Sequence, residues 1–317
     1  MVEPGTLITG AYKNLLLATA VMTTLLVIMG GVVCATESGL GCPDWPGCYG
    51  RPYPPPRADA IIEYSHRISA VLASTLIVVA AVQGWRRYRS IRWVSRTLAA
   101  AIPLLIAVSV FGAFAVLTGL SPGMAALDLG SALLVLALVV TAAVTAAARH
   151  ANPARIDRLS TRTPISRLAV WTLAGLFVVL VSGVLVAESN AIVRCLGWPF
   201  GYSGSGSELS ADTVPWPQLL RNLVAGVTSI LTIVLVVQVW RTQRGRPALV
   251  RTATAVGFSF LVEMAVGAFM LVRGASSFLL VTYVAAAVAH WALLTALTIL
   301  AATVPISFQE RPRGRQE

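Results

Sequence analysis

The chain alternates long apolar runs with short polar segments, and this pattern predicts membrane-spanning helices. The hydrocarbon core of a bilayer is about 30 Å thick, so a helix needs roughly 20 mainly apolar residues to cross it. The first run is long and no small-residue cleavage site with a polar mature start follows it, so it predicts a helix and not a signal peptide. The pattern predicts eight spanning helices, near residues 14–35, 61–85, 97–118, 122–147, 168–187, 218–240, 252–272 and 277–303.

Composition supports the same fold class. Of 317 residues, 56% are hydrophobic and only 12% are charged, and the mean hydropathy is +0.77. A soluble domain of this length could not bury so much apolar surface. The sequence therefore predicts an all-α integral membrane protein.

The net charge of +11 has a topological explanation. Of the 24 Lys and Arg residues, 18 lie on one side of the predicted membrane: Lys13 and the clusters at 86–96, 149–167, 241–251 and 311–315. The positive-inside rule makes that side cytoplasmic, with both termini inside, and we expect the cell (plasma) membrane. Because orientation explains the charge, we expect no nucleic-acid partner.

The two halves of the chain repeat one pattern. A short apolar segment, a loop with Trp-Pro and a later Gly-Ala-Phe recur: GVVCA, CPDWPGCY and GAF at 31–35, 42–49 and 112–114, then GVLVA, CLGWPFGY and GAF at 183–187, 195–202 and 267–269. Such a repeat predicts two tandem four-helix bundles, residues 1–150 and 151–317. An even number of helices in each repeat gives both halves the same orientation, so equivalent positions lie at equal depth.

The chemistry has diverged between the repeats. In register, His66 corresponds to Leu220, Glu63 to Pro217 and Asp128 to Tyr283. The second repeat is therefore a degenerate copy.

Cys42 and Cys48 share the first outer loop, where a disulfide is permitted. Zinc is the alternative, but no second Cys or His pair lies on that side to complete a tetrahedral site. We favour the disulfide. We expect Cys34 and Cys195 to be unpaired, although both lie near the outer surface and a bridge is the alternative.

Glu63 and His66 lie three residues apart, on one face of a predicted helix at its outer end. Such a pair also occurs in di-iron bundles, but those need a second pair and further carboxylates. A histidine there suits haem iron, because neutral imidazole binds iron and a bundle interior can hold a flat macrocycle. The alternative is a histidine hydrogen-bonded to a neighbouring acid, and the motif alone leaves both open.

The segment ESGLGCPDWPGC at 37–48, followed by EYSHR at 63–67 within an eight-helix tandem repeat, resembles the haem A synthase family of the CtaA type. The resemblance covers nearly the whole chain and is most specific in the first half. It implies oxidation of the C8 methyl of haem O to a formyl group on the outer side of the membrane, supplying haem A to terminal oxidases. It further implies haem O as substrate, a resident haem b, and haem O synthase and cytochrome oxidase assembly as partners.

The resemblance also implies roles for single residues. In that family each bundle offers two histidines to a haem, one on its second helix and one on its fourth. His66 matches the first ligand, Glu63 matches the acid implicated in catalysis, and Cys42 and Cys48 match the loop pair thought to handle reducing equivalents.

This sequence departs from the family pattern at three positions. Asp128, Leu220 and Tyr283 occupy the places of the other three histidines. The chain has only three histidines; His150 follows Arg149 at a cytoplasmic helix end, where we expect no ligand role. His290 is the remaining candidate iron ligand in the second bundle, but it lies about 10 Å deeper than Tyr283 at 1.5 Å rise per residue.

His290 has a polar neighbour at its own depth. Glu263 lies near the middle of the seventh predicted helix, and charged groups alone inside a membrane are costly. We therefore predict a hydrogen bond or ion pair between Glu263 and His290.

Three further polar residues have two interpretations each. Asp128 lies at nearly the depth of His66; a direct bond would leave no room for a macrocycle, whereas an open slot would admit one. Arg67 and Arg221, at matched positions, suit haem propionates, or else extend to the membrane interface.

The leading interpretation is a haem A synthase-like membrane oxidoreductase acting at the first bundle. One alternative is a catalytically silent relative that binds haem or assists oxidase assembly. Another is a polar-relay or transporter-like bundle built on Glu263 and His290.

Overall fold

A computed structural model describes residues 7–119, 121–152, 159–186, 216–274 and 276–303. Within these residues eight helices are each long and apolar enough to cross a membrane, which confirms the predicted fold class. Their bounds are α1 Gly10–Ala35, α2 Ala58–Arg87, α3 Arg92–Leu117, α4 Pro122–Ala151, α5 Pro164–Val186, α6 Trp216–Thr242, α7 Pro247–Arg273 and α8 Ser277–Ala302.

The helices extend beyond the predicted apolar runs mainly at their arginine-rich ends. Helix α7 begins at Pro247 instead of residue 252, and α3 begins at Arg92 instead of residue 97. Hydropathy locates only the part of a helix that suits lipid. Arginine is a good helix former, so the polar turns outside the lipid stay helical.

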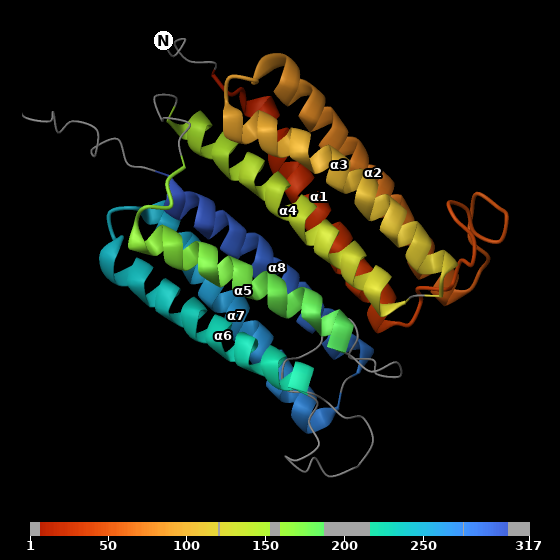
Figure 1. The fold of residues 1–317 in the computed structure, drawn as a ribbon. Helices are drawn as coiled ribbons and strands as arrows, with labels where there is room; N and C mark the ends of the chain where they lie inside the picture. The colour runs from red at the N-terminus through yellow and green to blue at the C-terminus, as the bar shows by residue number, and fades with distance from the viewer. Residues whose placement is uncertain (1–6, 120, 153–158, 187–215, 275, 304–317) are drawn as a thin grey trace, which may run out of the picture.

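The helices form two closed four-helix rings that lie side by side (Figure 1). In the first ring α2 and α4 occupy diagonal positions, because each packs against both α1 and α3. In the second, α6 and α8 each pack against both α5 and α7. Contacts of α1 with α8 and of α4 with α5 and α8 join the rings.

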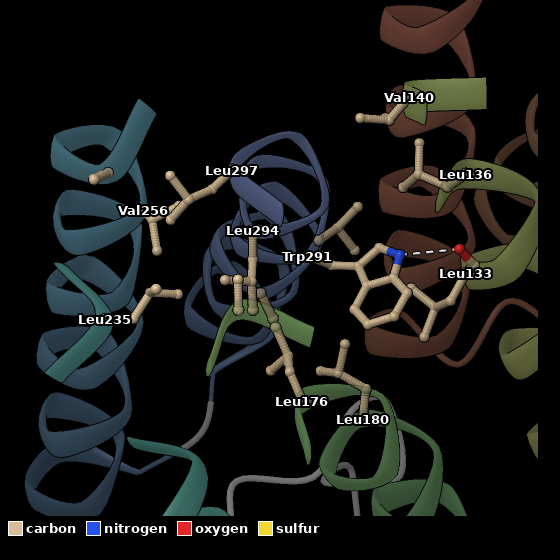
Figure 2. Close-up of a cluster of buried hydrophobic side chains, with 14 of the residues drawn as sticks. Leu133, Leu136, Val140, Leu176, Leu180, Leu235, Val256, Trp291, Leu294 and Leu297 are labelled. Atoms are coloured by element: carbon tan, nitrogen blue, oxygen red, sulfur yellow. Dashed lines mark hydrogen bonds between the residues drawn. The ribbon is translucent and has the colours of Figure 1, made fainter. Parts of the chain in front are cut away.

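A shared apolar cluster joins the two rings, with side chains from α4, α5, α6, α7 and α8 (Figure 2). Trp291 of α8 points across this boundary, and its Nε1–H donates a hydrogen bond to the backbone oxygen of Leu133 in α4 at 2.9 Å. Buried tryptophan N–H groups need such a partner. The bond therefore fixes α8 against α4 without leaving a polar atom unsatisfied.

Packing differs sharply between the second ring and one half of the first ring. This half, called the outer half, lies at the end that carries the loop between α1 and α2. In α1 no residue between Val27 and Ala35 is buried, and in α3 none between Ala101 and Ala115. The same holds in α2 between Glu63 and Ala73. In α6 and α7, by contrast, buried residues recur at nearly every turn. The outer half of the first ring is thus loosely packed, and the second ring is filled.

Gly31 allows α1 to approach α8 closely. A Cβ built at Gly31 would lie 2.1 Å from Cγ1 of Val284. We predict that Gly31→Ala lowers the free energy of unfolding by about 1–3 kcal/mol, because overpacking forces backbone shifts. Thermal unfolding in detergent measures this loss.

Gly226→Ala is the matched control, since a Cβ at Gly226 in α6 would meet nothing within 4 Å. Alanine is favoured over glycine inside a helix by about 1 kcal/mol, so this variant should be as stable as the parent or more so. Equal destabilisation by both substitutions would contradict the close approach of α1 and α8.

Candidate functional site

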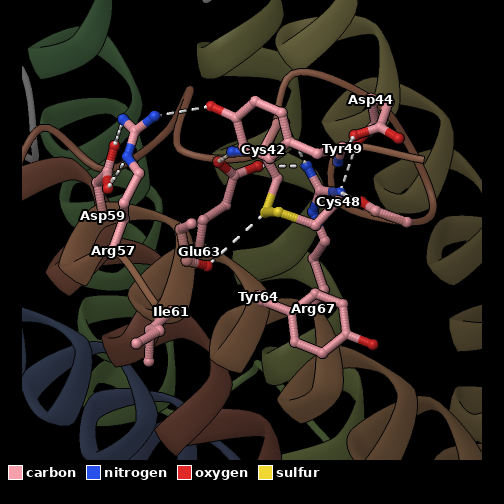
Figure 3. The surroundings of a disulfide bond; sticks show 12 residues. Cys42, Asp44, Cys48, Tyr49, Arg57, Asp59, Ile61, Glu63, Tyr64 and Arg67 are labelled. Atoms are coloured by element: carbon pink, nitrogen blue, oxygen red, sulfur yellow. Dashed lines mark hydrogen bonds and ion pairs between the residues drawn. A yellow bond between two sulfur atoms is a disulfide. The ribbon is translucent and has the colours of Figure 1, made fainter. Parts of the chain in front are cut away.

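The loop between α1 and α2 is closed by a Cys42–Cys48 disulfide, which confirms the predicted pairing (Figure 3). Both cysteines are fully buried, and they pack with Ala60 at the start of α2. Gly41 permits this approach, because a Cβ there would lie 2.5 Å from the backbone carbon of Asp59. The disulfide is therefore held against the outer end of α2.

Arg67 fastens this loop to α2 from below. Its guanidinium donates to the backbone oxygens of Asp44 at 2.6 Å, Cys42 at 3.0 Å and Gly47. It also forms an ion pair with Glu63, one turn earlier in the helix. The planar fork of arginine suits several acceptors at once. Sequence reasoning missed this role, because backbone oxygens of a distant loop leave no signal in the residue pattern.

Glu63 holds the other side of the same junction. One carboxylate oxygen accepts from the Arg67 guanidinium, and the other accepts from the backbone N–H of Cys42 at 2.8 Å. Only 3% of Glu63 is exposed. The carboxylate thus lies directly beneath the disulfide, and its charge is compensated by hydrogen bonds to a cation and an amide.

Asp44 shapes the tip of the loop. Its carboxylate accepts from the backbone N–H groups of Gly50 and Tyr49, each at 2.6 Å. The hydrogen bond from Gly50, followed by that from Tyr49, lowers the pKa of Asp44 below its usual value. An open hollow of about 490 Å³ lies beside this tip, lined by Asp44, Trp45, Pro46, Gly47, Gly50, Arg51, Pro52 and Tyr64.

Cys34 corrects one sequence prediction. We expected it to be unpaired, but it takes part in a disulfide. It lies in the last turn of α1, at the same end of the ring as the Cys42–Cys48 disulfide. Cys195, the other cysteine of that prediction, lies outside the described residues.

His66 lies one turn below the loop junction and is half-buried. Its ring packs on α1, where a Cβ at Gly30 would lie 3.3 Å from the His66 Cε1. The Nδ1 atom is buried, and among the described residues it has no hydrogen-bond partner. A polar group without a partner inside a bundle is costly, which favours a missing ligand.

Asp128 of α4 does not bond His66 within the described part of the chain. Its carboxylate packs against α3 instead, where a Cβ at Gly112 would lie 3.4 Å from Oδ1. At 1.5 Å per residue, His66 lies about 12 Å and Asp128 about 9 Å from the outer ends of their helices. The two side chains thus lie at a similar depth in the first ring, on helices α2 and α4, which stand diagonally opposite each other.

The first ring fits a haem on these observations. The Nδ1 atom of His66 has no partner among the described residues, and the helices around it are loosely packed at that depth. Glycines lie beside both polar side chains: Gly30 of α1 next to His66 and Gly112 of α3 next to Asp128. Neutral imidazole is the common ligand of haem iron. Arg67 is already occupied by the loop and Glu63.

The second ring does not fit a haem held by two histidines. Leu220 is 53% exposed on the outside of α6. Tyr283 is buried, and its hydroxyl donates to Oε1 of Glu263 at 3.4 Å. Arg221 is buried beside Tyr283 and interacts with it electrostatically. Leu220 thus points away from the interior, and Tyr283 and Arg221 are packed where the repeat would place a second macrocycle.

The predicted contact between Glu263 and His290 is confirmed. Nδ1 of His290 lies 2.9 Å from Oε2 of Glu263, and both residues are buried. His290 is also packed edge-on against Phe260. The pair lies in the filled interior of the second ring, so its position does not suit His290 to a macrocycle.

Arg67→Gln should make the buried disulfide easier to reduce, because it removes the cation that ties the loop to Glu63. We expect reduction by a water-soluble phosphine to quicken about tenfold, which corresponds to roughly 1.4 kcal/mol. Peptide mapping after maleimide labelling follows Cys42 and Cys48 separately from Cys34.

Arg57→Gln is the control, because Arg57 bonds Asp59 and Tyr49 at the exposed rim of the same loop. Exposed ion pairs contribute little, so the rate should change by less than about twofold. Equal rates of disulfide reduction in both variants would contradict the role of Arg67 in holding the loop.

The Glu263 and His290 pair should show strong coupling in stability. Glu263→Leu or His290→Leu alone leaves a buried polar partner unsatisfied and should lower the free energy of unfolding by about 1–3 kcal/mol. The double variant removes both partners and should lose less than the sum of the single losses. Unfolding in detergent measures all three; additive losses would contradict the coupling.

Comparisons with known proteins show the family of this chain. Residues 13–304 match the COX15-CtaA family, described as cytochrome oxidase assembly protein. The haem A synthase of Alkalihalophilus pseudofirmus is 30% identical over 249 residues, 77% of this chain and 80% of the relative. That of Halalkalibacterium halodurans is 30% identical over 230 residues, 71% of this chain and 74% of the relative. That of Shouchella clausii is 28% identical over 244 residues, 76% and 80% of the two chains. This chain therefore belongs to the COX15-CtaA family of cytochrome oxidase assembly proteins.

Proposed function

We propose that this protein is a haem A synthase-like membrane oxidoreductase that oxidises the C8 methyl of haem O to a formyl group. The observation that carries the proposal is His66, an imidazole without a described partner in the loosely packed outer half of the first ring. Its curated relatives are named haem A synthase, which supports the same activity.

The proposed roles follow from the contacts. His66 would hold the iron of haem O, and Asp128 stands where the family has its second histidine. Glu63 is the catalytic carboxylate, and Arg67 fixes it beneath the loop. Converting the methyl to a formyl group adds one oxygen atom and releases four electrons, so the reaction would need water and an external electron acceptor besides the bound haem. A resident haem b in the second ring forms no part of the proposal, because Tyr283 and Leu220 do not fit one.

We assign different roles to the two halves of the repeat. Residues 1–150 form the substrate bundle with its outer disulfide loop, and residues 151–317 form the degenerate one. The arginine distribution supports a protein of the cell membrane with cytoplasmic termini and the Cys42–Cys48 loop outside. Haem O synthase would supply the substrate, and the oxidase assembly would take the product.

A second candidate is a relative that binds haem without oxidising it. The observation that favours it is the filled second ring, which removes the family's second haem site. The two candidates differ in product and not in the residue that holds the iron.

Expression in a strain that makes haem O but lacks haem A synthase separates them. We predict haem A in extracts analysed by chromatography, and its loss in His66→Ala, because the imidazole that holds the substrate is gone. His150→Ala is the matched control, since His150 Nδ1–H donates to the Ile8 backbone oxygen at 2.8 Å at the other end of the ring.

Bound haem O without haem A would establish the silent relative instead. Haem A formed equally by His66→Ala would contradict the assignment of His66. The His150→Ala control shows whether replacing a histidine elsewhere in the same ring lowers expression. A loss of haem A in His66→Ala alone is therefore attributed to the contact with the substrate.

A further inference from the structure

The second ring contains a buried polar network at the depth of the membrane interior. Its members are Glu263 of α7 with Tyr283 and His290 of α8, which are 6%, 4% and 2% exposed. His290 Nδ1–H donates to one oxygen of the Glu263 carboxylate at 2.9 Å, and the Tyr283 hydroxyl donates to the other at 3.4 Å. Glu263 therefore accepts from two sides.

One atom of this network is left without a partner. His290 Nε2 is buried, and no protein atom among the described residues bonds it. Nε2 accepts a hydrogen bond when the imidazole is neutral and donates one when the ring is protonated. A buried polar atom without a partner costs about 1–3 kcal/mol, so this atom needs a ligand that can both donate and accept.

A small cavity adjoins this atom. It has a volume of about 30 Å³, and His290, Glu263 and Tyr283 line it together with Thr228, Ser229 and Thr232 of α6. Helix α5 contributes only the apolar Leu176 and Val179 to its wall. A water molecule needs roughly 10–15 Å³ of such space and two to four polar partners. A cofactor pocket occupies hundreds of Å³.

We propose that the second ring binds water at His290 Nε2 and uses no haem there. The water bonds to Nε2 and completes a hydrogen-bonded chain from Tyr283 through Glu263 and His290 to the hydroxyl groups of α6. Arg221 of α6 supplies the nearest positive charge, beside Tyr283. A metal ion fits less well, since no group of three or more His, Cys, Asp or Glu gathers within the described residues.

The site is independent of the proposed activity, because it involves no residue of the first ring. It also explains why the degenerate repeat keeps costly polar groups in a membrane-spanning bundle. In this ring a chain of hydrogen-bonded side chains takes the place of a macrocycle, and the bound water pairs with His290 Nε2 at its end.

Radiolytic hydroxyl labelling of the purified protein tests the site, because radicals formed from bound water modify adjacent side chains. Met264 lines the cavity and is partly exposed, whereas Met270 on the same helix is buried and does not line it, so faster labelling of Met264 supports the site only if it falls when the cavity is changed. We expect Met264 and His290 to be modified at least about fivefold faster than Met270. Equal rates at Met264 and Met270 would overturn the proposal.

His290→Asn removes Nε2 but keeps an N–H donor for Glu263, so the variant should fold. We expect labelling of Met264 to fall about fivefold in it while that of Met270 is unchanged. Ala225→Leu fills the cavity from α6 and should have the same effect with His290 intact. Unchanged Met264 labelling in both variants, or loss of bound haem in His290→Asn, would refute the water site.

Discussion

The cost of leaving a polar group without a partner inside a membrane governs this structure. Bulk water is absent there, so each such group must bond to protein, to a ligand or to a bound water molecule. Glu63 and Arg67 satisfy each other and the outer loop, and Glu263 satisfies His290. In the first ring, two buried atoms have no partner among the described residues: Nδ1 of His66 and Oγ1 of Thr145 in α4. Of these two side chains, only the imidazole is a common ligand of haem iron, so His66 is the candidate site.

The two rings have the same topology, but their packing differs. The second ring places a buried side chain at nearly every turn of α6 and α7, and the cavity beside His290 is the size of water. The first ring is loose around His66, while the half farther from the disulfide loop is tightly packed by residues such as Tyr12, Leu16 and Leu98. Rigid packing on one side of an open site holds ligand-binding side chains in place.

Much of this arrangement could be predicted from the sequence, because the physical signals are local or follow from depth. Apolar run length predicted the eight helices, and the cost of lone charges at equal depth predicted the contact between Glu263 and His290. The Cys42–Cys48 pairing followed from a shared outer loop. The disulfide of Cys34, the loop contacts of Arg67 and the separation of Asp128 from His66 depend on how distant segments meet. No periodicity reports such contacts.

The central claim is that one imidazole, His66, holds one haem in the first ring and that the second ring holds none. The haem content of purified protein, measured per chain from its pyridine haemochrome spectrum, tests this most directly. The account predicts about one haem per chain in the parent protein and almost none in His66→Ala. Two haems per chain, or an unchanged ratio in His66→Ala, would contradict it.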